Sequence, residues 1–229
     1  MIASIVGSAL HAGAAAAALS APLAPGVVLT RYAAALSALH EPRTFTVEYT
    51  LEQTGTRSLE QTHRIFRRGP DERDETIAVN GTRATAPTIR IFRGHPYRYT
   101  VTRLAPAPAR YAFTYLGIVL DGRHADYVFA LTPKGSPGDF TLTRVSIDGI
   151  SFLPAAIVFE TFANSGKGGV TFAKVGPWWV ATGASASARV PGGVANERLT
   201  FANWRFPASL PASTFAVARP LPEALTIPG

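Results

Sequence analysis

Most of the chain after Pro42 alternates between apolar and polar side chains with a period of two residues. In segment 44–53, apolar residues occupy every second position, and Thr, Glu or Gln fills the others. The same alternation recurs at 97–102 and at 111–115. A period of two with one polar face is typical of antiparallel strands that are buried on one side. The pattern predicts a mainly β protein.

Glycine-containing turn signals divide this region into about eleven or twelve strands. Asn80-Gly81, Asp121-Gly122 and Asp148-Gly149 suit the positive φ angles of two-residue hairpin turns. The gaps are too short for βαβ crossovers, so we expect a large antiparallel meander. The alternation slips by one residue within 140–147 and within 199–206, as it does at a β-bulge. Wide sheets curl, which predicts a half-open barrel.

One helix is expected, over residues 27–40. Its apolar residues recur at helical spacing, and Pro42 ends it. We expect this helix to pack on or in the concave face of the sheet.

The N-terminus has the layout of an export signal over residues 1–20. The run is apolar and rich in Ala, with small residues before the expected cleavage point. No basic residue precedes the run, and this absence is consistent with a true start upstream of Met1. The alternative is an uncleaved membrane anchor, because the run approaches the span of about 20 residues. Since prolines follow at once, we favour cleavage and a periplasmic or secreted protein. Residues 21–229 are then one β domain with a Pro-rich tail, 207–229.

The composition excludes several classes of protein. With 229 residues and 47% hydrophobic content, the chain can bury one sizeable core and is not disordered. It has no Cys, which excludes disulfides and thiolate metal sites. The net charge is +7, but the basic residues are spread along an exported chain, which argues against nucleic acid. The histidines are scattered and no catalytic motif is present, so we expect no enzyme, metal or cofactor.

A single short helix is too little to fill the concave face of so wide a sheet. We therefore expect an apolar cavity that holds acyl chains, each buried methylene contributing about 0.8 kcal/mol. The alternative, in which the aromatic side chains pack together without space, stays open. Trp178-Trp179 puts one indole on each face, one in the core and the other at the cavity rim or a membrane contact. The candidate lining residues are Phe45, Val47, Tyr49, Leu51, Tyr97, Tyr99, Val101, Tyr111, Phe113 and Tyr115.

The densest charge cluster spans residues 63–75. Three of its four arginines, Arg64, Arg67 and Arg68, are candidates for docking an anionic lipid headgroup, an anionic membrane surface or a partner protein. The competing interpretation, which we favour, is a solvated hairpin whose basic and acidic halves pair weakly. Farther along the chain, Arg90 and Arg98 are expected on a basic outer face.

The order of these parts resembles a known family. A helix is followed by the strand 44–49, an Asp148-Gly149 turn is followed by Leu153-Pro154, and segment 201–207 precedes a final Phe215. This arrangement resembles the periplasmic lipoprotein-sorting carrier superfamily of bacterial envelopes. The resemblance implies an unclosed barrel, covered by helices, that binds the acyl chains of lipoproteins or other lipids and carries them through the periplasm.

The chain also departs from that family. The carriers have lid helices among their strands, whereas the corresponding stretch here, 104–110, is short and rich in Ala and Pro, and the arginine that holds the lid shut has no clear counterpart. Two other functions therefore remain open. One is an envelope sensor or scaffold that binds a protein partner through the hairpin at Arg67 and Arg68. The other is an outer-membrane barrel, which the Pro-rich end of the chain disfavours.

Overall fold

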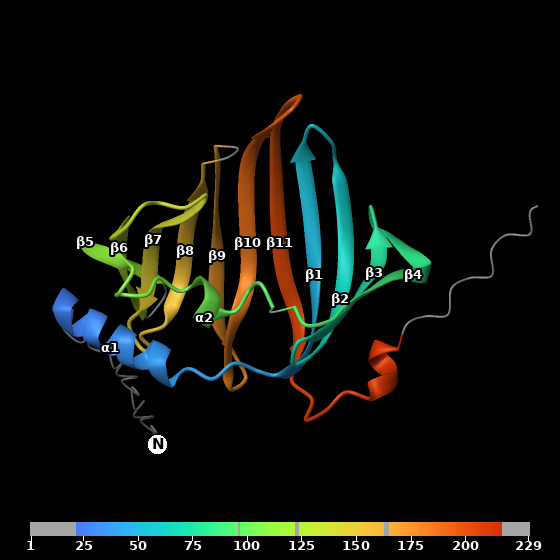
Figure 1. Ribbon diagram of the computed structural model, residues 1–229, viewed down its shortest axis with the longest axis horizontal. Coiled ribbons are helices and arrows are strands. Elements are labelled where there is room, and N and C mark those ends of the chain that lie inside the picture. Colours follow the sequence, from blue (N-terminus) through green and yellow to red (C-terminus); the bar gives the residue numbers. More distant parts are fainter. Residues whose placement is uncertain (1–21, 96, 122–123, 163–164, 217–229) are drawn as a thin grey trace, which may run out of the picture.

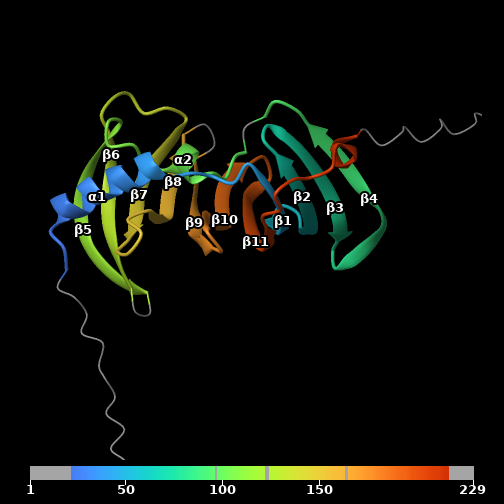
Figure 2. The same ribbon diagram turned by 90° about the horizontal axis from the view of Figure 1, so that it is seen from below.

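Eleven strands form one antiparallel sheet that curves without closing (Figures 1 and 2). The computed structural model describes residues 22–95, 97–121, 124–162 and 165–216. The mainly β, half-open fold predicted from the alternation is confirmed. The strands are β1 (Thr44–Gly55), β2 (Leu59–Arg68), β3 (Asp71–Val79), β4 (Thr82–Phe92), β5 (Tyr111–Asp121), β6 (His124–Pro133), β7 (Phe140–Asp148), β8 (Pro154–Thr161), β9 (Gly166–Val175), β10 (Trp178–Val190) and β11 (Gly193–Arg205).

The sheet is a meander interrupted at one point. The strand order is β4-β3-β2-β1-β11-β10-β9-β8-β7-β6-β5, so β4 and β5 lie at opposite edges. The chain crosses the whole sheet between them and returns strand by strand until β11 pairs with β1. The first and last strands are thus neighbours in the middle of the sheet. In a purely sequential meander, they would lie at opposite edges.

Within the described residues, three short helices accompany the sheet: α1 (Pro25–Ala38), α2 (Val101–Leu104) and the 3₁₀ helix η1 (Ala212–Phe215). The expected helix over 27–40 is confirmed as α1, displaced by two residues. Pro25 occupies its first turn, where a missing backbone N–H costs nothing. Figure 2 shows α1 lying along the concave side, over the β5–β8 end of the sheet. Among the described helices, none is both long enough and apolar enough to span a bilayer.

The crossing between β4 and β5, residues 93–110, is here called the strap, and it includes α2. A strand over 97–102 was expected, and this prediction is wrong: Val101 begins α2, and the residues before it belong to no strand. Arg98 and Tyr99 form a turn, so the tyrosines on either side of Arg98 reach the sheet without belonging to a strand. Tyr97 and Tyr99 accordingly contact Phe45 and Phe201 of the sheet.

Both expected β-bulges are confirmed. Between β1 and β11 the register shifts, so that Thr46 pairs with Arg205 but Glu48 pairs with Ala202. The extra residue lies in β11, where Asn203 has a φ of 55°. A second shift between β7 and β8 adds one residue to β7 next to Leu142.

The turns follow the sequence in part. Asn80 and Gly81 have φ angles of 49° and 74°, as a two-residue hairpin turn requires. The expectation of such a turn at Asp148 is wrong, because β8 begins only at Pro154 and the Asp148 carboxylate accepts hydrogen bonds from the two backbone N–H groups of Ile150 and Ser151. Residues 1–20, Gly122 and the end of the tail lie outside the described residues.

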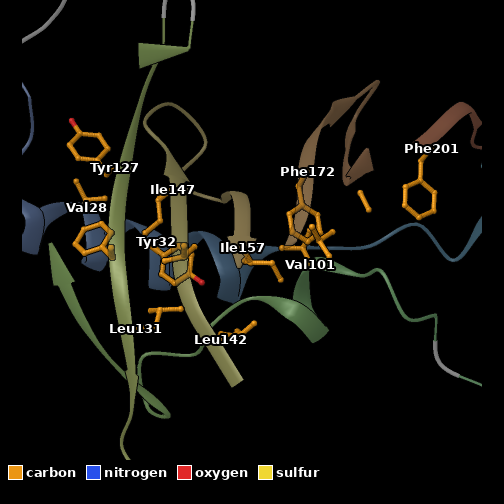
Figure 3. Packing of buried hydrophobic residues seen from close by; sticks show 14 of the residues in the cluster. Val28, Tyr32, Val101, Tyr127, Leu131, Leu142, Ile147, Ile157, Phe172 and Phe201 are labelled. Carbon is orange, nitrogen blue, oxygen red and sulfur yellow. The ribbon is translucent and has the colours of Figure 1, made fainter. Parts of the chain in front are cut away.

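The main core lies between α1 and strands β5–β9. Val28 and Tyr32 of α1 are fully buried and point toward the inner face of β6 and β7 (Figure 3). The Tyr32 hydroxyl donates to the Pro106 carbonyl of the strap at 2.9 Å, and its ring lies 5.9 Å from Phe113. Val101 of α2 extends this packing toward Phe172. This half of the concave face is therefore filled by protein.

Candidate functional site

A hollow of about 980 Å³ remains in the middle of the concave face. It lies between the α1–β1 linker, the strap and the ends of β1, β10 and β11. We call it the aromatic hollow, because its walls carry Phe45, Tyr97, Tyr99, Trp178, Trp179, Trp204 and Phe206. Its lining also includes charged side chains from the linker and strap, among them Glu41, Arg43 and Arg103.

The aromatic rings of this hollow contact one another. The Phe45 ring centroid lies 5.1 Å from that of Tyr97 and 5.2 Å from that of Trp204. Trp204 in turn stacks on Phe206 with 5.9 Å between centroids. The bulge at Asn203 makes this possible, since the extra residue returns Trp204 to the face that carries Phe201.

Two polar atoms are buried in this aromatic surface without a partner among the described residues: the Tyr97 hydroxyl and Trp204 Nε1. Burial raises the pKa of Tyr97 well above its usual value, and the nearby Glu72 carboxylate acts in the same direction. The phenol therefore stays protonated and keeps a donor to offer. Buried polar groups normally find a partner, so these two atoms are exceptions within the described residues.

The strap is fastened to the rest of the protein on three sides. Glu41 Oε1 accepts hydrogen bonds from Thr102 N at 2.8 Å and from Thr102 Oγ1 at 2.9 Å. The Arg67 guanidinium donates to the His95 carbonyl, and the Tyr32–Pro106 bond fixes the opposite end. The wall that the strap supplies is thus held in place without a ligand.

A second hollow of about 510 Å³ adjoins the first and shares Tyr97, Tyr99 and Arg103 with it. It lies between the strap and the inner face of β1–β4. We call it the arginine-lined hollow, because Arg90 and Arg98 also line it. Arg90 and Arg98 were expected on an outer face. That prediction is wrong, because the strap folds over the sheet and the side of β4 that carries Arg90 is the concave one.

The charge cluster 63–75 is paired, as expected, but half of it faces the interior. Arg67 is nearly fully buried and binds Glu72 at 2.9 Å, directly across the β2–β3 pair. His63 Nδ1 lies 2.7 Å from Asp74 Oδ1, and both side chains are buried. The expected solvated hairpin is therefore wrong for these two pairs. Desolvation raises the pKa of Glu72, while its pairing with Arg67 opposes the shift.

The other two candidate docking arginines project from the opposite face of β2. Arg64 binds Glu48 at 2.7 Å, and Asn203 donates to the same carboxylate. These hydrogen bonds, that of Asn203 first, lower the pKa of Glu48. Arg68 lies 3.4 Å from Asp71 and 4.7 Å from the Phe215 ring of η1. The three arginines therefore do not form one surface.

The ten candidate lining residues divide into three groups. Phe45, Tyr97, Tyr99 and Val101 line the aromatic hollow, and Tyr49 lines the arginine-lined hollow together with Tyr97 and Tyr99. Val47 is fully buried in the sheet, and Leu51 lies farther along β1 without lining either hollow. The remaining three, Tyr111, Phe113 and Tyr115, belong to β5 at the end of the sheet covered by α1.

Sequence reasoning missed Trp204 and Phe206 as lining residues. The slip in segment 199–206 was the signal, because it places both side chains on the face of Phe201. Trp178 and Trp179 were expected on opposite faces, yet both line the aromatic hollow. Trp179 Nε1 also donates to the Pro154 carbonyl at 2.9 Å. Within the described part of the chain, no three His, Asp or Glu side chains gather as metal ligands would.

Comparison with family models and with curated protein sequences finds no match. Solved structures with a similar arrangement include a LolA superfamily protein from Nitrosomonas europaea, at 12% identity, over 85% of this chain and 98% of that one, with a TM-score of 0.44. A domain assigned to outer membrane lipoprotein sorting, from Vibrio parahaemolyticus, aligns at 14% identity, over 82% and 94% of the two chains, with a TM-score of 0.47.

A DUF1329 family protein from Desulfovibrio piger aligns at 11% identity, over 83% of this chain and 97% of that one, with a TM-score of 0.45. The superfamily that the sequence resembles is thus represented among these structures. The likeness concerns the fold alone, and the site is argued below from the residues of this chain.

Proposed function

We propose that this protein is a lipid-binding protein of the bacterial envelope that holds acyl chains in the aromatic hollow and carries them between membranes. One observation supports this most: a preformed hollow of about 980 Å³ is walled by seven aromatic side chains. Ligand pockets usually enclose about 300–1,000 Å³, so the hollow is large enough for a long apolar chain. An export signal over residues 1–20 would deliver such a carrier to the envelope.

The expected affinity follows from the buried methylenes. Each contributes about 0.8 kcal/mol, so ten of them supply about 8 kcal/mol before the cost of association. That corresponds to dissociation constants of about a micromolar or weaker. A carrier has to release what it binds, and an affinity in this range allows both steps without a catalytic group.

The position of the tryptophans provides the test. All three tryptophans of the chain line the aromatic hollow, so a bromine-labelled acyl chain that enters it quenches their emission together. Titration with dibromostearate should quench strongly, while unlabelled stearate should compete. The purified protein should also carry lipid that mass spectrometry detects. Absence of both quenching and bound lipid would overturn the proposal.

A matched pair of variants localises the binding. Ala208 is exposed at the rim of the aromatic hollow, so Ala208→Phe obstructs the hollow without disturbing the core. Ala109 is exposed and lines neither hollow, which makes Ala109→Phe its control. Binding should weaken in the first variant only. Equal affinities in both would place the acyl chain elsewhere.

The outer edge of β5 favours a second function, that of a sensor or scaffold that binds a protein partner. None of the described segments pairs with this edge, and its apolar side chains Leu116, Val119 and Leu120 are more than half exposed. Such an edge accepts an extended segment of another protein as an added strand. Val119→Lys should abolish partner capture and leave quenching by dibromostearate intact. Loss of both would contradict two separate surfaces.

A further inference from the structure

Three arginines of the arginine-lined hollow form no ion pair within the described residues. Arg90 of β4 and Arg98 and Arg103 of the strap line it, and none of the three makes a hydrogen bond or ion pair within the described residues. By contrast, the nearby Arg67 and Arg93 are engaged, with Glu72 and with Asp71 respectively.

Both acidic residues of the same hollow already have a hydrogen-bonding partner, and Arg98 affects Glu72 only through its charge at longer range. Glu72 accepts from Arg67 at 2.9 Å, and Asp74 Oδ1 lies 2.7 Å from His63 Nδ1. Three guanidinium groups around one concave space repel one another unless an anion lies between them. Each also presents several N–H donors in a planar fork that matches the oxygens of phosphate or carboxylate.

The two hollows are neighbours along the strap. Tyr97, Tyr99 and Arg103 line both of them, so a molecule that lies across these three residues places one end in each. An apolar compartment next to a cationic compartment fits an amphiphile with a negative head.

We propose that the arginine-lined hollow binds the phosphate head of the amphiphile whose acyl chain occupies the aromatic hollow, through Arg90, Arg98 and Arg103. A phosphate is favoured over a carboxylate because its three free oxygens serve several guanidinium groups at once, whereas two carboxylate oxygens are matched by one. This inference rests on the proposed function, since it assigns the head of the same ligand.

Three probes separate the contributions of the head and the chain: dodecyl phosphate, dodecanol and inorganic phosphate, each titrated by calorimetry below any micelle-forming concentration. Dodecyl phosphate should bind at least about tenfold more tightly than dodecanol, because charge-assisted hydrogen bonds add to the burial of the same chain. The difference should shrink as salt is added, since the three arginines are exposed.

The variant that tests the site replaces the two arginines that line this hollow alone, R90Q/R98Q. Its control, R83Q/R189Q, removes the same charge from two exposed arginines that line neither hollow. We expect the preference for dodecyl phosphate to vanish in the first variant only, with dodecanol binding unchanged in both. Circular dichroism checks that both variants are folded, and the unchanged dodecanol affinity shows that the aromatic hollow is intact.

Each other outcome overturns a defined claim. Equal affinity of the wild-type protein for dodecyl phosphate and dodecanol refutes the head site and leaves the proposed function standing. Tight binding of inorganic phosphate alone, with no gain from the chain, identifies a free-anion site and refutes the link to the amphiphile. An equal loss in both double variants shows a general effect of net charge and also refutes the site. Failure of both dodecyl compounds to bind refutes the proposed function itself.

Discussion

Tyr32 offers the sharpest test of how α1 is joined to the rest of the protein. Its side chain is fully buried, its hydroxyl donates to the Pro106 carbonyl, and Pro106 is itself among the fully buried residues. Tyr32→Phe removes this hydrogen bond alone, whereas Tyr32→Ala removes the ring as well. The two variants therefore separate the bond to the strap from the packing against β5 and β6.

The expected magnitudes differ clearly. A buried carbonyl left without its donor costs about 1–3 kcal/mol, which is the expected loss in Tyr32→Phe. Deleting a buried aromatic ring costs about 3–5 kcal/mol, which applies to Tyr32→Ala. For a chain of this size, each kcal/mol lowers Tm by about 2–4 °C. Tyr32 lines neither hollow, so the folded fraction should bind acyl chains as before.

Chemical and thermal unfolding followed by circular dichroism measures these losses. The control is Tyr115→Phe, because Tyr115 is 40% exposed and should change stability by less than about 0.5 kcal/mol. If Tyr32→Phe is as stable as the wild type, the bond to the strap contributes nothing. If it is as unstable as Tyr32→Ala, the hydroxyl dominates and the packing argument is refuted.

Three further perturbations test other parts of the structure. Arg67→Gln should lower the free energy of unfolding in urea by about 3–5 kcal/mol, because it leaves the buried Glu72 unpaired. Arg68 and Asp71 form a half-exposed pair, so Arg68→Gln should cost less than about 1 kcal/mol. Similar losses in the two variants would contradict the faces assigned to these arginines. Because the pKa of Glu48 is lowered in the folded state, its contribution to stability is complete above the pKa of the unfolded state and is lost as pH falls through the pKa of the folded state. Glu48→Gln should therefore reduce the loss of stability in acid. An unchanged dependence of stability on pH would refute this. A Cβ on Gly168 would overlap the Ser185 carbonyl oxygen, so Gly168→Ala should destabilise the protein by about 1–3 kcal/mol. Equal unfolding midpoints in the wild type and the variant would contradict this.

The strands and bulges could be predicted because they depend on local alternation. The slip at 199–206 predicted the bulge that returns Trp204 to the concave face. The strap could not be predicted in this way, because Tyr97 and Tyr99 alternate there as they would in a strand. The crossing is required because β4 and β5 lie at opposite edges of the sheet. The sequence near residue 97 carries no sign of that strand order.

The charged interior was missed for a related reason. His63 and Arg67 lie two residues on either side of Ile65, so the period of two already placed all three on one face of β2. The burial of all three depends on the strap, which covers this face. At the contact between Arg67 and His95, the strap residue is 28 positions farther along the chain. Local pattern therefore gave the correct face, and the long-range crossing determined its burial.

The pairing of β1 with β11 has a consequence for synthesis. A chain that leaves the ribosome has to wait for residue 205 before its first hairpins can join the others, so two half-sheets with open edges exist until then. Such topologies fold slowly, and their exposed edges invite aggregation. In a nascent chain stopped before β11, no strand pairing would join the two half-sheets, which makes the last strand the one on which assembly of the whole sheet depends.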